Sequence, residues 1–118
     1  MVLVAVAAGG AARATVGERH LRLIKSSPAK DAELGNPPGE IRLWFSEETE
    51  LSVSRIKLTA ADGTEIELGR VEVGDENTLV AAVAAEFSAG SYEVAWRTSS
   101  RDGHPITGAF GFSVVDTE

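Results

Sequence analysis

Two residues near the C-terminus have side chains that bind metal ions. They are Asp102 and His104, separated by Gly103 and followed by Pro105. On an extended segment, residues two positions apart point to the same side, so both side chains could reach one ion, and Pro105 biases His104 toward that extended backbone. A carboxylate oxygen with an imidazole nitrogen suits Cu(II), zinc or nickel. The spacing alone favours the simpler alternative, a polar turn in which Asp102 caps backbone N–H groups and His104 is exposed.

The chain has one other histidine, His20, which stands just before the first strand-like run. In a β-sandwich the first strand can lie near the last two strands, and this would bring His20 to His104. The alternative is an exposed residue at the start of a strand, and His20 taken alone favours that interpretation. The meeting of the two histidines is therefore a hypothesis that needs further support.

The composition excludes several kinds of site. The net charge is −7, from 18 acidic and 11 basic residues, which argues against a surface for nucleic acid or anionic lipid. The absence of cysteine excludes disulfides, thiolate zinc sites, iron–sulfur clusters and thiol nucleophiles. The single methionine is Met1, so no thioether site for Cu(I) is expected inside the domain.

Short runs of alternating apolar and polar residues begin after His20, and this period of two is typical of β-strands. The runs lie at 21–25, 41–45, 53–58, 66–73, 79–83, 92–96 and 110–114. Turn residues separate them, and Asp62-Gly63 predicts a hairpin between Leu58 and Ile66. About seven short strands in roughly 100 residues predict an all-β fold, an antiparallel Greek-key β-sandwich of the immunoglobulin-like kind.

The first 19 residues differ from the rest. Residues 2–8 are apolar and residues 9–14 are small, ending in Ala-x-Ala, a pattern that resembles the end of a secretory signal. The alternative is a frayed N-terminal arm. No later segment has the roughly 18 apolar residues needed to span a membrane. We therefore expect an arm or signal remnant at 1–19 and a single β-sandwich domain at 20–118.

Side chains near Asp102 also have structural interpretations. Trp96, in the strand before the motif, is expected to lie in the core. Arg97 and Arg101 either orient Asp102 or belong to a solvated face.

Three longer stretches carry a family resemblance. They are HLRLIKSSPA from His20, IRLWFSE from Ile41 and GSYEVAWRTSSRDGHPITG from Gly90, with an aromatic strand from Phe110 closing the domain. Together they resemble the CopC/PcoC (YobA-like) family of copper-resistance proteins over residues 20–115. The last stretch is the longest and the most specific.

That resemblance implies a periplasmic or secreted β-sandwich that binds one Cu(II) ion per chain. In the family the ligands are the N-terminal histidine, through its amine and imidazole, and the Asp and His of the D-x-H motif. These positions correspond to His20, Asp102 and His104. The Glu of Phe-Ser-Glu, here Glu47, lies near the metal in some members as a weak ligand or a hydrogen-bonding neighbour. Two imidazoles, an amine and a carboxylate form the nitrogen and oxygen set that Cu(II) prefers.

Two features depart from the family pattern. Some members carry a methionine-rich loop for Cu(I), whereas this chain has no methionine there, so no Cu(I) site is expected. The family histidine is normally the first residue after cleavage, but Gly17-Glu18-Arg19 precedes His20 here. Cleavage after Ala14 would leave His20 its imidazole without a free amine, which would weaken the site and change its pH dependence. An unusual cut directly before His20 is the alternative.

Three functions are weighed on this basis. The first is a Cu(II) carrier or buffer for copper resistance, sequestration or delivery, with a CopD-like copper transporter of the inner membrane as partner. The second is an immunoglobulin-like interaction module that binds copper weakly or not at all. The third is a copper monooxygenase-like enzyme, which is disfavoured because the chain is short and an Asp ligand leaves less open coordination for oxygen. We therefore expect no enzymatic activity, no nucleic-acid partner and no membrane span.

Overall fold

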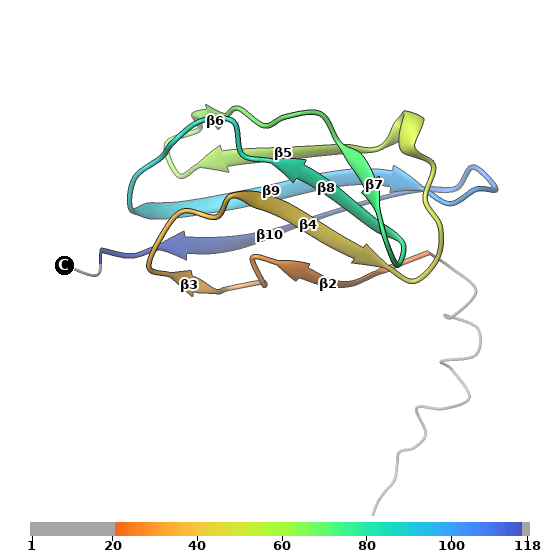
Figure 1. The fold of residues 1–118 in the computed structure, drawn as a ribbon, viewed down its shortest axis with the longest axis horizontal. Coiled ribbons are helices and arrows are strands. Elements are labelled where there is room, and N and C mark those ends of the chain that lie inside the picture. Colours follow the sequence, from red (N-terminus) through yellow and green to blue (C-terminus); the bar gives the residue numbers. More distant parts are fainter. Residues whose placement is uncertain (1–20, 117–118) are drawn as a thin grey trace, which may run out of the picture.

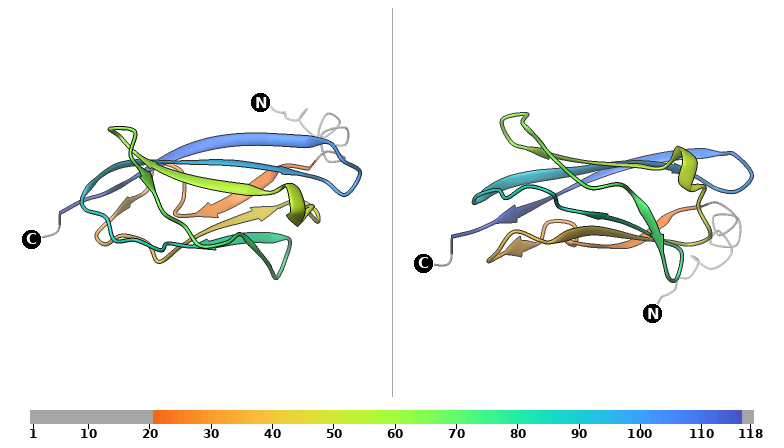
Figure 2. Two further views of the ribbon diagram at one scale, coloured as in Figure 1. Left: turned by 90° about the horizontal axis from the view of Figure 1, so that it is seen from above. Right: turned by 45° about the horizontal axis from the view of Figure 1, so that its top comes forward.

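The computed structural model describes residues 21–116, which fold into two β-sheets packed face to face (Figures 1 and 2). The five-stranded sheet has the order β3 (Glu33–Leu34), β10 (Pro105–Val114), β9 (Gly90–Ser99), β5 (Arg55–Ala60) and β6 (Glu65–Ile66). The four-stranded sheet has the order β2 (Leu23–Ser27), β4 (Glu40–Phe45), β8 (Thr78–Ala82) and β7 (Glu72–Gly74). A 3-10 turn, η1 (Leu51–Val53), leads from β4 to β5. The predicted all-β sandwich is confirmed.

Alternation along the strands builds the core between the sheets. In β4 the side chains of Ile41, Leu43 and Phe45 are buried, while Arg42 and Trp44 on the opposite side are partly exposed. The strands β9 and β10 follow the same rule and bury Tyr92, Val94, Trp96, Phe110, Phe112 and Val114. Burying one such side chain contributes about 1.5–3 kcal/mol. The predicted strand faces are therefore confirmed for these three strands.

The short strands refine the sequence prediction. The described residues form nine strands, of which β3 and β6 have two residues each. Two residues cannot reveal a period of two, so the sequence did not predict β3. The pairing of β3 with β10 is parallel, and the other strand pairs are antiparallel. The predicted hairpin is confirmed, because Leu58 lies opposite Ile66 across the turn at Asp62-Gly63.

The hairpin of β9 and β10 positions the motif found in the sequence. The two strands pair without interruption from Ser99 opposite Pro105 to Gly90 opposite Val114. The indole of Trp96 packs edge-on against Phe45 of the other sheet, with ring centroids 5.3 Å apart, so Trp96 lies in the core as expected. This contact fixes the hairpin to the second sheet close to the loop that contains Asp102.

The chain enters the described region at the same end of the sandwich as the β9–β10 loop (Figure 1). Leu21, the first described residue, is 6% exposed and belongs to the core cluster. The predicted arm at 1–19 and the predicted ligand His20 lie outside the described residues. Within residues 21–116 no helix has the length and apolar character that a membrane crossing requires.

Candidate metal-binding loop

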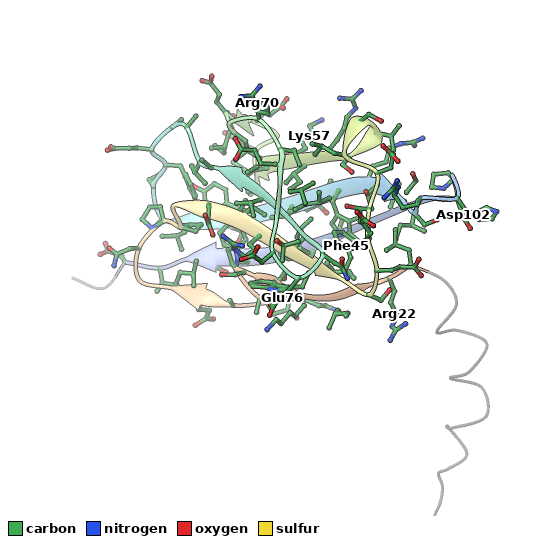
Figure 3. All side chains as sticks on the ribbon, turned by 45° about the vertical axis from the view of Figure 1, so that its right-hand side comes forward. Arg22, Phe45, Lys57, Arg70, Glu76 and Asp102 are labelled. Carbon is green, nitrogen blue, oxygen red and sulfur yellow. The ribbon has the colours of Figure 1, made fainter. Side chains whose placement is uncertain are left out.

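The loop between β9 and β10 closes on itself through the backbone. The N–H of Gly103 donates to the carbonyl of Ser100 at 2.9 Å, and the N–H of Ser100 donates to the carbonyl of His104 at 3.3 Å. Gly103 has φ +92°, a value that side-chain-bearing residues rarely adopt. The sequence Asp-Gly therefore produces a tight turn that contains residues 102 and 104, and Figure 3 shows Asp102 at the tip of the hairpin.

Asp102 is the centre of the hydrogen bonds in this loop. Its Oδ1 accepts from the hydroxyl of Ser100 and from the backbone N–H of His104, the latter at 3.3 Å. Its Oδ2 lies 3.2 Å from Nδ1 of the His104 ring. The structure thus brings two of the predicted site residues, Asp102 and His104, side by side with a nitrogen and an oxygen facing each other.

Both side chains remain open to solvent. The side chain of His104 is 80% exposed and that of Asp102 is 66% exposed. The hydrogen bond from Ser100, followed by that from the His104 backbone, holds the pKa of Asp102 below its usual range, because hydrogen bonds to a carboxylate favour its charged form. The loop therefore presents an ionised oxygen donor and an imidazole to any ion that arrives from solvent.

The base of the loop is fixed by the segment that follows β4. Thr49 forms an isolated antiparallel bridge with Ser100, and the N–H of Glu50 donates to the carbonyl of Ser99 at 2.9 Å. Deeper in the strand, the hydroxyls of Ser54 and Thr98 share a buried hydrogen bond of 2.6 Å. These contacts hold the end of β9 in place, so the donors at the tip project from a supported hairpin.

Arg101 does not orient Asp102, which was one of two interpretations of the sequence. Its guanidinium instead pairs with Glu48 at 3.1 Å and with Glu50 at 3.5 Å. The residue that does orient Asp102 is Ser100, which sequence reasoning missed. A hydroxyl two positions before the aspartate was the available signal, but many turns contain such a serine.

Glu47 belongs to the same segment and directly follows Ser46. Ser46 connects the segment to the start of the described chain, because its N–H donates to the carbonyl of Arg22 at 2.9 Å and its hydroxyl accepts from the Arg22 N–H at 3.0 Å. Among the residues that the structure describes, no three His, Asp or Glu side chains converge into a metal-binding group. Glu47 therefore does not complete a three-donor set with Asp102 and His104 there, and its role stays a prediction.

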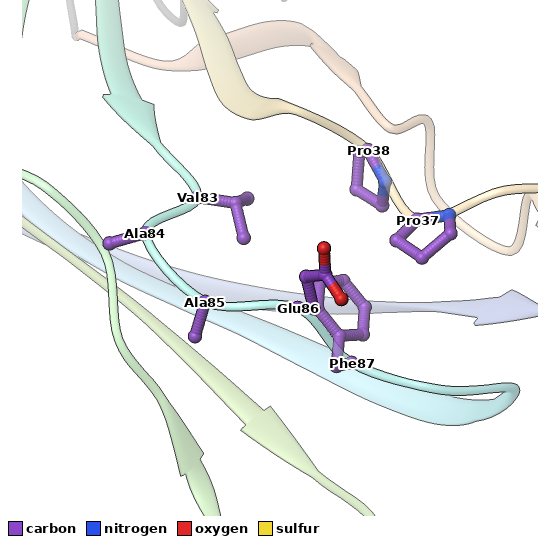
Figure 4. A pocket seen from close by; sticks show the side chains of 7 residues that line it. All are labelled: Pro37, Pro38, Val83, Ala84, Ala85, Glu86 and Phe87. Carbon is purple, nitrogen blue, oxygen red and sulfur yellow. The ribbon is translucent and has the colours of Figure 1, made fainter.

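A cavity of about 470 Å³ lies at the opposite end of the sandwich from the β9–β10 loop. In Figure 4, Glu86 and Phe87 point toward Pro37 and Pro38, and residues 83–85 complete the lining. Glu86 is the one ionisable side chain among the lining residues. This cavity lacks the imidazole and the paired donors that distinguish the β9–β10 loop.

Comparison with known proteins places this fold and loop in a family. The model of the CopC domain matches residues 23–115. The chain belongs to the CopC domain family. The resemblance predicted from the three sequence stretches is thereby confirmed.

Individual CopC-related proteins extend this finding. The chain is 37% identical over 114 residues to copper resistance protein C of Pseudomonas syringae pv. tomato, covering 91% of this chain and 90% of that protein. It is 28% identical to copper transport protein CutJ of Bacillus subtilis, over 80% of this chain but 18% of CutJ. The solved structure of PcoC, a methionine-rich copper resistance protein from Escherichia coli, superposes with a TM-score of 0.73 and 33% identity, covering 81% of this chain and 99% of PcoC. The family thus connects this CopC domain with copper resistance and copper transport.

Proposed function

We propose that this CopC domain binds one Cu(II) ion per chain at the β9–β10 loop and carries or buffers it in the periplasm or outside the cell. The observation that carries the proposal is the pair of Asp102 Oδ2 and His104 Nδ1, which lie 3.2 Å apart on an exposed, supported turn. The relatives named for copper resistance and copper transport support copper as the ion.

The separation of the two donor atoms suits a shared ion. In zinc sites, imidazole nitrogen and carboxylate oxygen lie about 2.0–2.1 Å from the ion. At such bond lengths, two neighbouring donors lie about 2.9 Å apart when the angle at the ion is a right angle, and about 3.3 Å apart when it is tetrahedral. The 3.2 Å between Asp102 and His104 falls inside that interval. An ion entering between them would need little movement of the loop, and it would meet a carboxylate that is already charged.

Further donors are proposed to come from His20, and more weakly from Glu47. His20 directly precedes Leu21, whose burial anchors the chain at this end of the sandwich. The contact of Arg22 with Ser46 and the bridge of Thr49 with Ser100 connect the chain entrance to the loop through one segment. Together with a free amine at His20, two imidazoles and a carboxylate would supply the tetragonal set that Cu(II) prefers.

The proposed role is binding and transfer, without catalysis. We assign the copper-binding domain to residues 20–118 and propose a CopD-like transporter of the inner membrane as the recipient. CutJ supports this partner, because its name describes transport and the matching region is a small part of a longer protein. We propose no Cu(I) site, since PcoC is described as methionine-rich whereas the single methionine here is Met1.

Competitive titration with a Cu(II) chelator tests this function. We expect the exported, processed protein to bind one equivalent of Cu(II), and we expect His20→Ala to weaken binding while leaving the fold intact. Mass spectrometry of the same sample identifies the first residue, so the contribution of a free His20 amine can be separated from that of its imidazole. If the processed protein takes up no Cu(II), the interaction-module hypothesis replaces the carrier hypothesis.

A further inference from the structure

Three cations lie together on the outer face of the five-stranded sheet. Arg55, Lys57 and Arg97 are exposed, and the register places Arg55 directly opposite Arg97 and Lys57 opposite Ala95. These three residues are called the basic face below. Its position is unexpected in a chain with a net charge of −7, because most of the molecule repels anionic groups.

Folding does not require this arrangement. Like charges directly opposite each other on neighbouring strands are destabilising, and within residues 21–116 no acidic side chain forms an ion pair with any member of the basic face. Two described arginines outside the basic face do have acidic partners, since Arg42 contacts Glu40 and Arg101 contacts Glu48. The cluster on the basic face is therefore left available to an external anion.

The surface between these cations is hollowed. A depression of about 550 Å³ is lined by Arg55, Lys57 and Arg97 and by uncharged residues of β9 and β10: Ala95, Trp96, Thr107, Gly108 and Ala109. A neighbouring cavity of about 450 Å³ is lined by both Arg55 and Arg70, and Figure 3 shows Lys57 and Arg70 on the same side of the molecule. A fourth cation thus extends the positive region along the edge of β5.

Positive and negative side chains lie at opposite ends of this sheet face. Glu93 and Glu65 both lie in register with Thr59, two residues farther along β5 than Lys57 and away from the metal-binding loop. The positive end is therefore the end near the loop, since Arg97 stands two residues before the last residue of β9. An anionic segment would be attracted to the end of this face that carries Arg55 and Arg97 and repelled from the end that carries Glu65 and Glu93.

We propose that the basic face is the docking site for an acidic segment of a protein partner. The partner is identified by its chemistry, an extended stretch with several carboxylates that meet Arg55, Lys57 and Arg97 over the depression between them. Docking there would hold the partner beside Asp102 and His104, and in this respect the inference rests on the proposed transfer of copper. The binding of the segment itself does not require copper.

Chemical-shift titration of the isotope-labelled protein with a synthetic peptide of alternating Glu and Ser tests the docking site. At low ionic strength we expect saturable shifts confined to the amides of β5, β9 and β10 around the basic face. Raising the ionic strength to about 0.5 M should weaken binding, because exposed charge pairs are screened. The triple variant Arg55→Gln/Lys57→Gln/Arg97→Gln should bind the peptide about tenfold more weakly.

A matched triple variant separates the site from net charge. Arg22→Gln/Lys25→Gln/Lys30→Gln removes the same number of exposed cations from outside the basic face, and we expect it to bind the peptide as the wild type does. Equal weakening by both triple variants, shifts outside the basic face, no saturable binding, or self-association of the chain through this face would each overturn the proposal. Copper titration of the same variants keeps the two hypotheses apart, because the basic-face variant should retain its Cu(II) affinity.

Discussion

Two turns in this molecule have nearly the same backbone and differ in chemistry. Asp62-Gly63-Thr64 connects β5 to β6, and Asp102-Gly103-His104 connects β9 to β10. Both glycines have φ +92°. In each turn the aspartate Oδ1 accepts the N–H of the residue two positions later, at 2.9 Å from Thr64 and 3.3 Å from His104.

The difference lies in the side chains around each aspartate. The main cause of the lowered pKa at Asp62 is the backbone N–H of Thr64, whereas at Asp102 it is the hydroxyl of Ser100. In the second turn His104 also places an imidazole next to the other carboxylate oxygen of Asp102, Oδ2. The sequence leaves a polar turn and a metal site as alternatives, but the two are compatible, because the turn itself brings the two side chains of the proposed metal site together.

Removing the imidazole should produce the largest contrast between the two turns. We expect His104→Ala to lower Cu(II) affinity about 100-fold or more, since even loss of a hydrogen-bonding partner of a ligand costs about 10–100-fold. Thr64→Ala should leave affinity unchanged. Competitive chelator titration measures the Cu(II) affinity of both variants. The melting temperature of His104→Ala should equal that of the wild type, because the His104 side chain is 80% exposed and contributes little to folding.

Neutralising each aspartate tests whether Asp102 is itself a donor. Asparagine retains the local hydrogen bond of such a turn but carries no charge. We expect Asp102→Asn to weaken Cu(II) binding about tenfold or more and Asp62→Asn to have no effect. The same titration measures the Cu(II) affinity of both variants. If Asp102→Asn binds Cu(II) as tightly as the wild type, Asp102 only shapes the turn.

Substituting the two glycines should affect stability equally and copper binding unequally. At both sites a Cβ would meet no atom within 4 Å, so the cost comes from the positive φ and is about 1–2 kcal/mol for Gly63→Ala and for Gly103→Ala. Denaturant unfolding measures this cost. Only Gly103→Ala should also weaken Cu(II) binding. Unchanged Cu(II) affinity in Gly103→Ala would show that the loop geometry is irrelevant to the site.

The smallest expected effect concerns the protonation of Asp102. Its folded-state pKa is lowered chiefly by Ser100, so its contribution to stability is fully present above the unfolded-state pKa and is lost as the pH falls through the folded-state pKa. Ser100→Ala should therefore raise the pKa of Asp102 toward its ordinary value and leave that of Asp62 unchanged. Carboxyl-carbon chemical shifts followed against pH measure both groups in one sample.

The sequence predicted those parts of the fold that have local causes. The buried alternation of Ile41, Leu43 and Phe45 follows from a strand with one face on the core, and the turn at Asp62-Gly63 follows from the preference of that pair for hairpins. The proximity of Asp102 and His104 also has a local cause, because the two residues share one short turn, whereas their assignment as metal ligands came from the family resemblance and stays a prediction.

Two features that depend on distant partners were not predicted. The parallel pairing of β3 with β10 joins residues 33–34 to residues 113–114, and nothing local in a two-residue strand encodes it. The pairing of Arg101 with Glu48 and Glu50 joins two chain segments that also meet at the bridge between Thr49 and Ser100. Such contacts are set by the packing of the two sheets, which a single sequence does not reveal.

Pulsed electron paramagnetic resonance of the Cu(II)-loaded protein tests the central claim most directly, because it counts the imidazoles bound to copper. The wild type should show two coordinated imidazoles, and His104→Ala and His20→Ala should each remove one, while Thr64→Ala retains both. A wild-type spectrum without imidazole coupling, or an unchanged spectrum in His104→Ala, would contradict the assignment of copper to the β9–β10 loop.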